Sequence, residues 1–458
     1  MAIFALPHEI LAVILSFLDP QSIIRFGRTC KTAYASTGPQ NQILWKSAFL
    51  HVFDDPDEAW SMTPGTPPST NERGFDFHTE LSKRFIALQA VRTRSCGSND
   101  RAEAYIEALL SILDTAKFTP NARDIANGKV PIEDDRYTSL NLQILSNLAE
   151  WREGIESLIY DTPSREFSPR PITRSMTVRE SERCRTSRAS RLHVMYGLTN
   201  WERVEHKARG AARRKVYDWT LIGADNDYAP FLRDGSGKVD WPLLEGVATV
   251  MRLNFSKCVD QIAAPEGFCY SLPHRTLVDP TTPEDWARAT GPWLGTYAFL
   301  DYADLWTYNN WEGQAEPRMT LDGEPEDCGD LMRLTLKLDP SISSDPRLQT
   351  KLPISTDLPV LYFSGHSRGY NGMRRLIIAV RGFACLVPGS REVRWRFLIN
   401  YGGQDHWLLE GIQPGGVRSG GIFGIWTHCD HEVNTPSGPF CYFPEELCKS
   451  TSVVVAAR

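Results

Sequence analysis

Near the amino terminus the chain reads Leu6-Pro7-His8-Glu9-Ile10-Leu11, and this segment runs on to Leu44-Trp45-Lys46. The apolar residues after Pro7 have the spacing of a helix with one wide apolar face. Asp19-Pro20 should end that helix and begin another, because Asp caps helix starts and Pro is tolerated at the first helical position. Residues 28–35 predict a third short helix. Helices this short cannot bury all their apolar surface among themselves, so a partner surface is implied.

The order of these residues resembles the F-box family. The family pattern is a Leu-Pro start, an acidic residue followed by Ile, a first helix ending in Leu-Asp, a Cys-Lys pair and a closing Leu-Trp-Lys. Phe26 stands where a Leu is more usual, which is a conservative change. The matching residues are Leu6, Pro7, Glu9, Ile10, Leu15, Leu18, Asp19, Ile23, Cys30, Lys31, Leu44, Trp45 and Lys46.

The resemblance implies a binding function for residues 1–50. F-box domains dock on the Skp-type adaptor of a cullin-RING ubiquitin ligase, with apolar helix residues filling pockets on a helical partner. The alternative is a helical cap that packs on the protein's own core. The residues that the resemblance assigns to the adaptor contact are Leu6, Pro7, Ile10, Leu11, Leu15, Leu18, Ile23, Phe26, Cys30, Leu44 and Trp45.

Composition indicates a soluble protein of the cytoplasm or nucleus. The chain has 458 residues, of which 41% are hydrophobic, and a net charge of only −6, so no general attraction to nucleic acid or membrane is expected. Ten cysteines are scattered singly, which predicts reduced thiols. The apolar run at residues 10–18 is too short to span a bilayer.

The chain is expected to divide into residues 1–50, residues 51–284 and residues 285–458. A Pro- and Gly-containing loop at about residues 54–74 opens the middle part, which is otherwise mostly helical. Helical spacing recurs at 80–93, 100–116 and 140–150, and these helices could act as a rigid spacer after the F-box. Thr199 and Glu202 have the spacing of a capping box that opens a helix toward Tyr217.

Basic residues gather in the second half of the middle part. Residues 165–215 contain fourteen Lys and Arg against five Asp and Glu. Arg213-Arg214-Lys215 could be a nuclear localisation signal, and the whole stretch of residues 165–215 could bind nucleic acid. No aromatic residues interleave with residues 170–191, so a solvated or acid-paired stretch is favoured and no nucleic-acid partner is expected.

The carboxy-terminal part alternates with a period of two. Residues 332–338 and 393–401 show the clearest alternation, and five further strands are expected at 293–300, 360–363, 376–383, 406–412 and 422–426. Seven or more strands without intervening helices predict an antiparallel barrel or sandwich. Gly295, Gly411 and Gly424 are expected at bends or bulges. The sequence segments Pro292–Tyr297 and Gly424–His431 resemble the C-terminal β-barrel of fungal F-box proteins. The fold class is therefore α+β and multidomain: three F-box helices, a helical middle and a β-domain.

Aromatic and basic side chains of the β-domain are candidates for target binding. Trp and Arg dominate binding hot spots, so these side chains could shape a groove for a degron peptide. The alternatives are plain core packing, or a barrel that encloses a small ligand. The candidate residues are Trp293, Trp395, Trp407, Trp426, Arg394, Arg396 and Arg418.

A hydrolase is the least favoured function. Gly365-His366-Ser367-Arg368-Gly369 matches a nucleophile elbow, and an acid and a histidine follow it in the required order, among Asp405, His406, His428, Asp430 and His431. However, Tyr370-Asn371-Gly372 breaks the helix that an elbow needs, so a hairpin loop is expected and no catalytic residue is assigned.

No metal or cofactor site is expected. His428-Cys429-Asp430-His431 has metal-ligand residue types, but adjacent residues of a strand point to opposite faces. At most two of these side chains should therefore converge.

Overall fold

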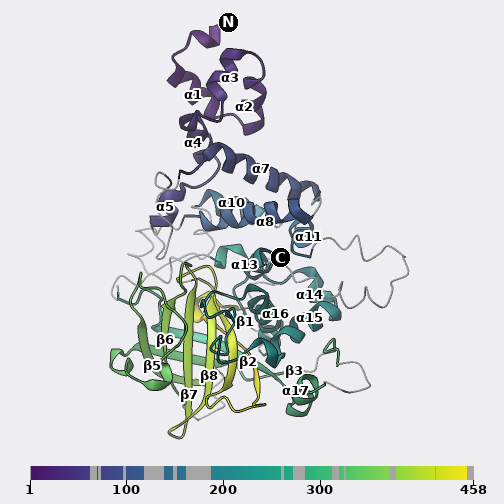
Figure 1. Cartoon of the computed structure of the whole chain (residues 1–458), viewed down its shortest axis with the longest axis vertical. Coiled ribbons are helices and arrows are strands. Elements are labelled where there is room, and N and C mark those ends of the chain that lie inside the picture. Colours follow the sequence, from purple (N-terminus) through teal and green to yellow (C-terminus); the bar gives the residue numbers. More distant parts are fainter. Residues whose placement is uncertain are drawn as a thin grey trace, which may run out of the picture. The chain divides into compact units, whose positions relative to one another are not determined.

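The computed structural model describes residues 2–61, 70, 74–95, 99–117, 139–147, 152–160, 187–258, 262–271, 284–311, 319–323, 326–370, 378–417 and 419–450 (Figure 1). The described residues up to 160 form one compact unit, and those from 187 onward form another. The predicted fold class is confirmed: helices at the amino end and in the middle are followed by an antiparallel β-barrel.

The first unit begins with the helices that the sequence predicts. Asp19 caps the second helix by accepting a hydrogen bond from the Ser22 amide at 3.0 Å, with Pro20 at the first helical position. The third helix begins at Lys31, later than predicted, because Cys30 caps it. These elements are η1 (Ala2–Ala5), α1 (His8–Ser16), α2 (Pro20–Gly27), α3 (Lys31–Thr37) and α4 (Gln42–Leu50).

Further helices of the first unit pack against α4. Part of the predicted loop at 54–74 is in fact helix α5. The helices expected at 80–93 and 100–116 are present and begin a little earlier than predicted. The elements are α5 (Pro56–Ser61), α7 (Phe77–Thr93), α8 (Asn99–Asp114), α10 (Leu140–Asn147) and α11 (Arg152–Tyr160).

The buried Asp54 carboxylate links the residues after α4 to α8 and α10 through hydrogen bonds. Asp54 accepts hydrogen bonds from the amides of Lys117 at 2.9 Å and Leu140 at 2.8 Å. Its own amide donates to Asn141 Oδ1 at 2.9 Å. Arg84 of α7 is also buried; its Nη2 donates to Ser111 Oγ on α8 at 2.9 Å and to Thr115 Oγ1, just after α8, at 3.0 Å. Buried polar contacts of Asp54 and Arg84 therefore tie the segment after α4 and helix α7 to α8 and α10.

The second unit is built around a closed eight-stranded antiparallel barrel. Each strand from β4 to β10 pairs with its neighbours in the chain, and β10 closes the ring by pairing with β2, with Phe440 opposite Tyr297. The predicted bounds of β4 and β7 are confirmed, whereas β10 was missing from the predicted strands. The barrel strands are β2 (Gly291–Leu300), β4 (Met332–Leu338), β5 (Leu361–Gly369), β6 (Ile378–Leu386), β7 (Val393–Tyr401), β8 (Gln404–Gln413), β9 (Ile422–His428) and β10 (Ser437–Pro444).

Aromatic rings fill the barrel interior. Trp395 packs against Trp293 and Phe363, with ring centroids 5.4 and 5.7 Å away. A side chain on Gly424 would meet the Phe440 ring at 2.6 Å and the Glu410 carbonyl oxygen at 2.0 Å. A bend or a bulge was expected at Gly424; the β8–β9 register runs unshifted through it, so it forms no bulge and makes room for a ring.

Helices of the middle region share a core with the barrel. Helix α16 contacts β2, β9 and β10, and the Phe255 ring lies 5.0 Å from the Phe443 ring. The second unit thus begins well before residue 285, where the β-domain was expected to start. Its helices are α13 (Ser187–Tyr196), α14 (Asn200–Val204), α15 (His206–Val216), α16 (Trp241–Cys258) and α17 (Tyr302–Asn309).

Short elements complete the second unit. Strand β3 (Glu326–Cys328) pairs with the far end of β2, and β1 (Ile262–Ala263) pairs with β11 (Lys449–Ser450). Cys258 and Cys328 form a disulfide, which differs from the expectation that the thiols are reduced. None of the helices that the structure describes is long and apolar enough to cross a membrane. The short 3-10 turns are η5 (Trp219–Leu221), η6 (Phe268–Tyr270), η8 (Pro340–Ile342), η9 (Pro346–Leu348) and η10 (Glu445–Leu447).

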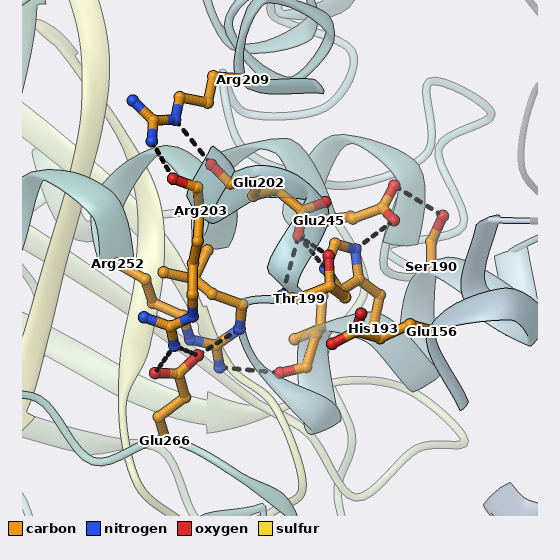
Figure 2. A network of polar contacts seen from close by, with 12 residues as sticks. Glu156, Ser190, His193, Thr199, Glu202, Arg203, Arg209, Glu245, Arg252 and Glu266 are labelled. Carbon is orange, nitrogen blue, oxygen red and sulfur yellow. Dashed lines mark hydrogen bonds and ion pairs between the residues drawn. The ribbon is translucent and has the colours of Figure 1, made fainter. Parts of the chain in front are cut away.

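A buried polar network joins α13, α14 and α16 (Figure 2). His193 Nδ1 lies 2.7 Å from Glu245 Oε1, and its Nε2 lies 3.4 Å from Glu202 Oε2. Glu202 also accepts the Thr199 amide at 2.9 Å, so the predicted capping box is present. The helix that it opens ends at Val204, and a separate helix continues to Val216.

Candidate functional site

Helix α1 is apolar on two sides. Leu11 and Leu15 are buried, and α1 packs against α4. On the other side Ile10, Val13 and Phe17 are 49%, 53% and 71% exposed. A helix that is apolar all round is normally buried, so the exposed side is an unpartnered surface. We call this surface the α1 face; it comprises Ile3, Phe4, Leu6, Ile10, Val13, Ile14, Phe17 and Leu18.

Ring contacts fix both ends of the α1 face. The Phe17 ring lies 4.3 Å from the His51 imidazole, and Ser16 Oγ lies 3.2 Å from His51 Nε2. At the other end the Phe4 ring stacks on Phe26 at 5.8 Å. The α1 face is therefore held in place by the rest of the helical domain before any partner binds.

The structure divides the residues predicted to bind the adaptor into two groups. Leu6, Pro7, Ile10, Leu18 and Cys30 are exposed, and Phe26 is half-buried. The others form the core of the domain. These core residues are Leu11, Leu15, Ile23, Leu44 and Trp45.

Sequence reasoning missed several members of the α1 face. Ile10, Val13, Ile14 and Phe17 follow the i, i+3, i+4, i+7 spacing of one helical stripe, beside the buried stripe that contains Leu11 and Leu15. That second stripe was visible in the sequence, but it was merged with the first into one wide face.

The geometry of these helices agrees with a comparison against protein families. The F-box-like family model matches residues 3–51. The chain carries an F-box-like domain. No curated protein and no solved structure matches the chain. The likeness of the C-terminal region to fungal F-box proteins stays a prediction.

Two of the tryptophans predicted to bind a target lie in the barrel core. Trp293 and Trp395 are buried, and each donates its indole N–H internally, to the Ala289 carbonyl at 3.3 Å and to Gln413 Oε1 at 3.1 Å. Their positions are those of core residues, the alternative that the sequence had left open.

The other two tryptophans lie close together near the end of β9. Trp407 is half-buried and packs edge-to-face on Trp426 at 5.0 Å. Trp426 donates its indole N–H to the Ala298 carbonyl at 3.1 Å and lies 6.2 Å from the ring of the exposed Tyr297. Trp426 is buried in the same core cluster as Trp293 and Trp395, so Trp407 is the only one of the four tryptophans that is partly exposed.

Arg394 and Arg396 are buried on the outer side of the barrel wall. Arg394 Nη2 lies 3.0 Å from Glu410 Oε1 and 2.7 Å from Asp227 Oδ2, and Arg396 pairs with the same two carboxylates. Burial works against the charge of Arg394, but Glu410 and Asp227 raise its pKa overall. Both guanidinium groups are thus committed to internal partners. Arg418 lies outside the described residues.

Ser367 does not lie on a nucleophile elbow. It is buried in the middle of β5, paired with Leu334 on one side and Ile378 on the other. The predicted hairpin loop at this position is wrong as well, because the segment is barrel strand. Among the described residues, neither Asp405 nor Asp430 bonds to the Ser367 hydroxyl; Asp405 pairs with Arg381 and Asp430 with Arg347.

The basic triplet on α15 is paired internally. Arg213 is buried and pairs with Glu326, Arg214 Nη1 lies 2.8 Å from Asp322 Oδ1, and Lys215 Nζ lies 3.2 Å from Glu245 Oε2. This is the acid-paired arrangement that was favoured over a nucleic-acid or nuclear-import surface.

Three metal-ligand side chains gather where at most two were expected. Strand β9 ends at His428, so Cys429 and Asp430 lie in a turn and do not alternate between the faces of a sheet. Their ligand atoms and one ring nitrogen of His428 all lie within 4.8 Å of one another.

Proposed function

We propose that this protein is the substrate-receptor subunit of an SCF-type cullin-RING ubiquitin ligase. In this proposal the F-box-like domain docks on a Skp-type adaptor, the second unit captures a target protein, and the complex acts in the cytoplasm or nucleus. The observation that carries the proposal is the α1 face, an exposed apolar surface on a domain of the F-box-like family. Burying one such aliphatic side chain in a partner contributes roughly 1.5–3 kcal/mol.

The proposed activity is non-catalytic. A receptor raises the rate of ubiquitin transfer by holding the target lysine near the charged conjugating enzyme, which is an effective-concentration effect. Because Asp54, Asn141 and the α4–α7 contacts join the F-box-like helices to the helices that follow, the first unit would present its adaptor site on a stiff support.

Co-purification with a Skp-type adaptor tests the proposal. The variant Leu6→Ala/Pro7→Ala/Ile10→Ala removes three exposed side chains, so the domain should stay folded. We expect its adaptor affinity to fall roughly a hundredfold, as for truncation of hot-spot residues. Ile86→Ala is the matched control, because Ile86 on α7 is 57% exposed and lies outside the α1 face. Unchanged adaptor binding by a triple variant with a normal circular dichroism spectrum would contradict the proposal.

A further inference from the structure

The turn after β9 places three different metal-ligand groups together. His428 Nδ1 lies 3.8 Å from Asp430 Oδ2, and Cys429 Sγ lies 3.7 Å from Asp430 Oδ1. Metal–ligand bonds of about 2.0–2.3 Å in a tetrahedral site put neighbouring ligand atoms roughly 3.3–3.8 Å apart. With one ligand atom taken from each residue, all three lie within 4.8 Å of one another, so they would have to move closer by up to about 1 Å around a bound ion.

The surrounding structure holds the three side chains in place. The His428 ring packs edge-to-face on Trp407 at 5.7 Å, across a register pair of β8 and β9. The Cys429 amide donates to the His406 carbonyl at 3.0 Å, and the Cys429 thiol donates to the Asp405 carbonyl at 2.9 Å. His428 Nδ1 accepts a hydrogen bond from the Asp430 amide at 3.3 Å, and this bond would have to be given up for that nitrogen to bind an ion.

A guanidinium group occupies part of the site. Arg347 Nη2 lies 3.2 Å from Asp430 Oδ1, and its Nε lies 3.5 Å from Asp405 Oδ2. Arg347 and Asp430 are each about half exposed, and exposed ion pairs contribute little to stability. An incoming divalent ion can displace Arg347 from Asp430, and Arg347 can keep its contact with Asp405.

We propose that His428, Cys429 and Asp430 bind a divalent transition-metal ion of the zinc class. Imidazole nitrogen, thiolate sulfur and carboxylate oxygen are all zinc ligands, and three protein ligands leave a fourth position open to water. Binding deprotonates the Cys429 thiol and releases that proton to solvent, while the sulfur lone pair forms the bond to the metal. The site is separate from the α1 face, so this inference does not depend on the proposed function.

Titration of the full-length, metal-free protein with Co²⁺, with the Cys258–Cys328 disulfide intact and Cys429 as a free thiol, tests the site. Thiolate ligation gives a sulfur-to-cobalt charge-transfer band, and Zn²⁺ should displace the cobalt and abolish it. We expect one equivalent to bind. Cys429→Ser should remove the band, and His428→Gln and Asp430→Asn should each weaken binding at least roughly tenfold. Cys30→Ser is the matched control, because Cys30 is exposed on a different unit and should leave the titration unchanged.

A specific site predicts that Arg347→Gln changes the metal affinity, whereas nonspecific metal binding by the protein predicts no change. Removing the competing positive charge should raise the Co²⁺ affinity several-fold, roughly up to tenfold. Absence of a charge-transfer band in the wild type, a band that survives in Cys429→Ser, unchanged affinity in His428→Gln, or weaker binding by Arg347→Gln would each overturn the proposal. All three ligands are at least partly exposed, so the variants should fold, and circular dichroism without metal checks this.

Discussion

The ring of Phe49, near the end of α4, lies edge-on against the ring of Phe77, the first residue of α7, with centroids 5.5 Å apart. Phe49 also contacts Phe53 and Phe75, and the Arg84 guanidinium lies 4.7 Å above its ring. This one side chain therefore joins the last F-box-like helix to the helices that follow it.

Phe49→Ala should weaken the packing of α4 against the helices that follow it. Phe49 is fully buried, so the substitution should lower the free energy of unfolding of the first unit by about 3–5 kcal/mol. Urea unfolding followed by circular dichroism measures the change. Ile86→Ala, an exposed position on α7, should change it by less than about 0.5 kcal/mol. Equal effects of the two variants would show that Phe49 does not join the helices.

Asp19→Ala should weaken the F-box-like domain in a pH-dependent way. Hydrogen bonds from the Ser22 side chain and amide hold the pKa of Asp19 below its usual value of 3.8. The cap is therefore fully effective above pH 3.8 and is lost as the pH falls below that value through the folded-state pKa. We expect a loss of about 1 kcal/mol at pH 7. Thermal unfolding from pH 7 to pH 3 should show the variant and the wild type converging.

Asp19→Asn is the control for this cap. The amide oxygen can still accept the Ser22 hydrogen bond, so most of the stability at pH 7 should remain. Both variants are compared with the wild type over the same pH range. If Asp19→Asn lost as much stability as Asp19→Ala, with the same pH dependence, the result would count against a capping role.

His193→Ala should strongly destabilise the second unit. Its imidazole lies between Glu202 and Glu245, and all three side chains are buried. Removing the imidazole takes a hydrogen-bonding group from two buried carboxylates, which should cost about 3–5 kcal/mol. The exposed His206, on α15, gives the control variant His206→Ala. Denaturant titration of the full chain, followed by tryptophan fluorescence, compares them; an effect of His193→Ala below about 1 kcal/mol would refute a structural role for the network.

Gly424→Ala should disturb the barrel. The added methyl group would overlap the Glu410 carbonyl and the Phe440 ring, so overpacking should cost about 1–3 kcal/mol. Gly323→Ala is the comparison, because a methyl group there meets nothing within 4 Å. Thermal melts should separate the two variants by several degrees, and coincident melts would show that the interior can absorb the methyl group.

Strand positions were easier to predict than the environment of their side chains. The alternation along β4 and β7 was sufficient to locate both strands. It could not show that both faces of β7 are buried, because Asp227 and residues 347–350 cover the outer face from distant parts of the chain. Alternation alone predicts an exposed face for Arg394 and Arg396, whereas both side chains are buried. Strand β10 was missed because Gly438 and Pro439 are typical of turns.

The location of the F-box-like domain was predictable, but which of its residues are exposed was only partly so. A family pattern records residues that hold the domain together, such as Ile23 and Trp45, alongside residues that reach a partner. Burial in three dimensions is needed to separate these two groups. The turn at Cys429 depended on where β9 ends, which alternation alone did not reveal.

The pairing of β10 with β2 has a consequence for biosynthesis. The ring cannot close until Ser437–Pro444 has left the ribosome, about 140 residues after β2. The helices of the first unit rely on contacts among earlier residues and can form while translation continues. The end of the nascent chain that is proposed to bind the adaptor should therefore be folded before the end that is proposed to hold the target.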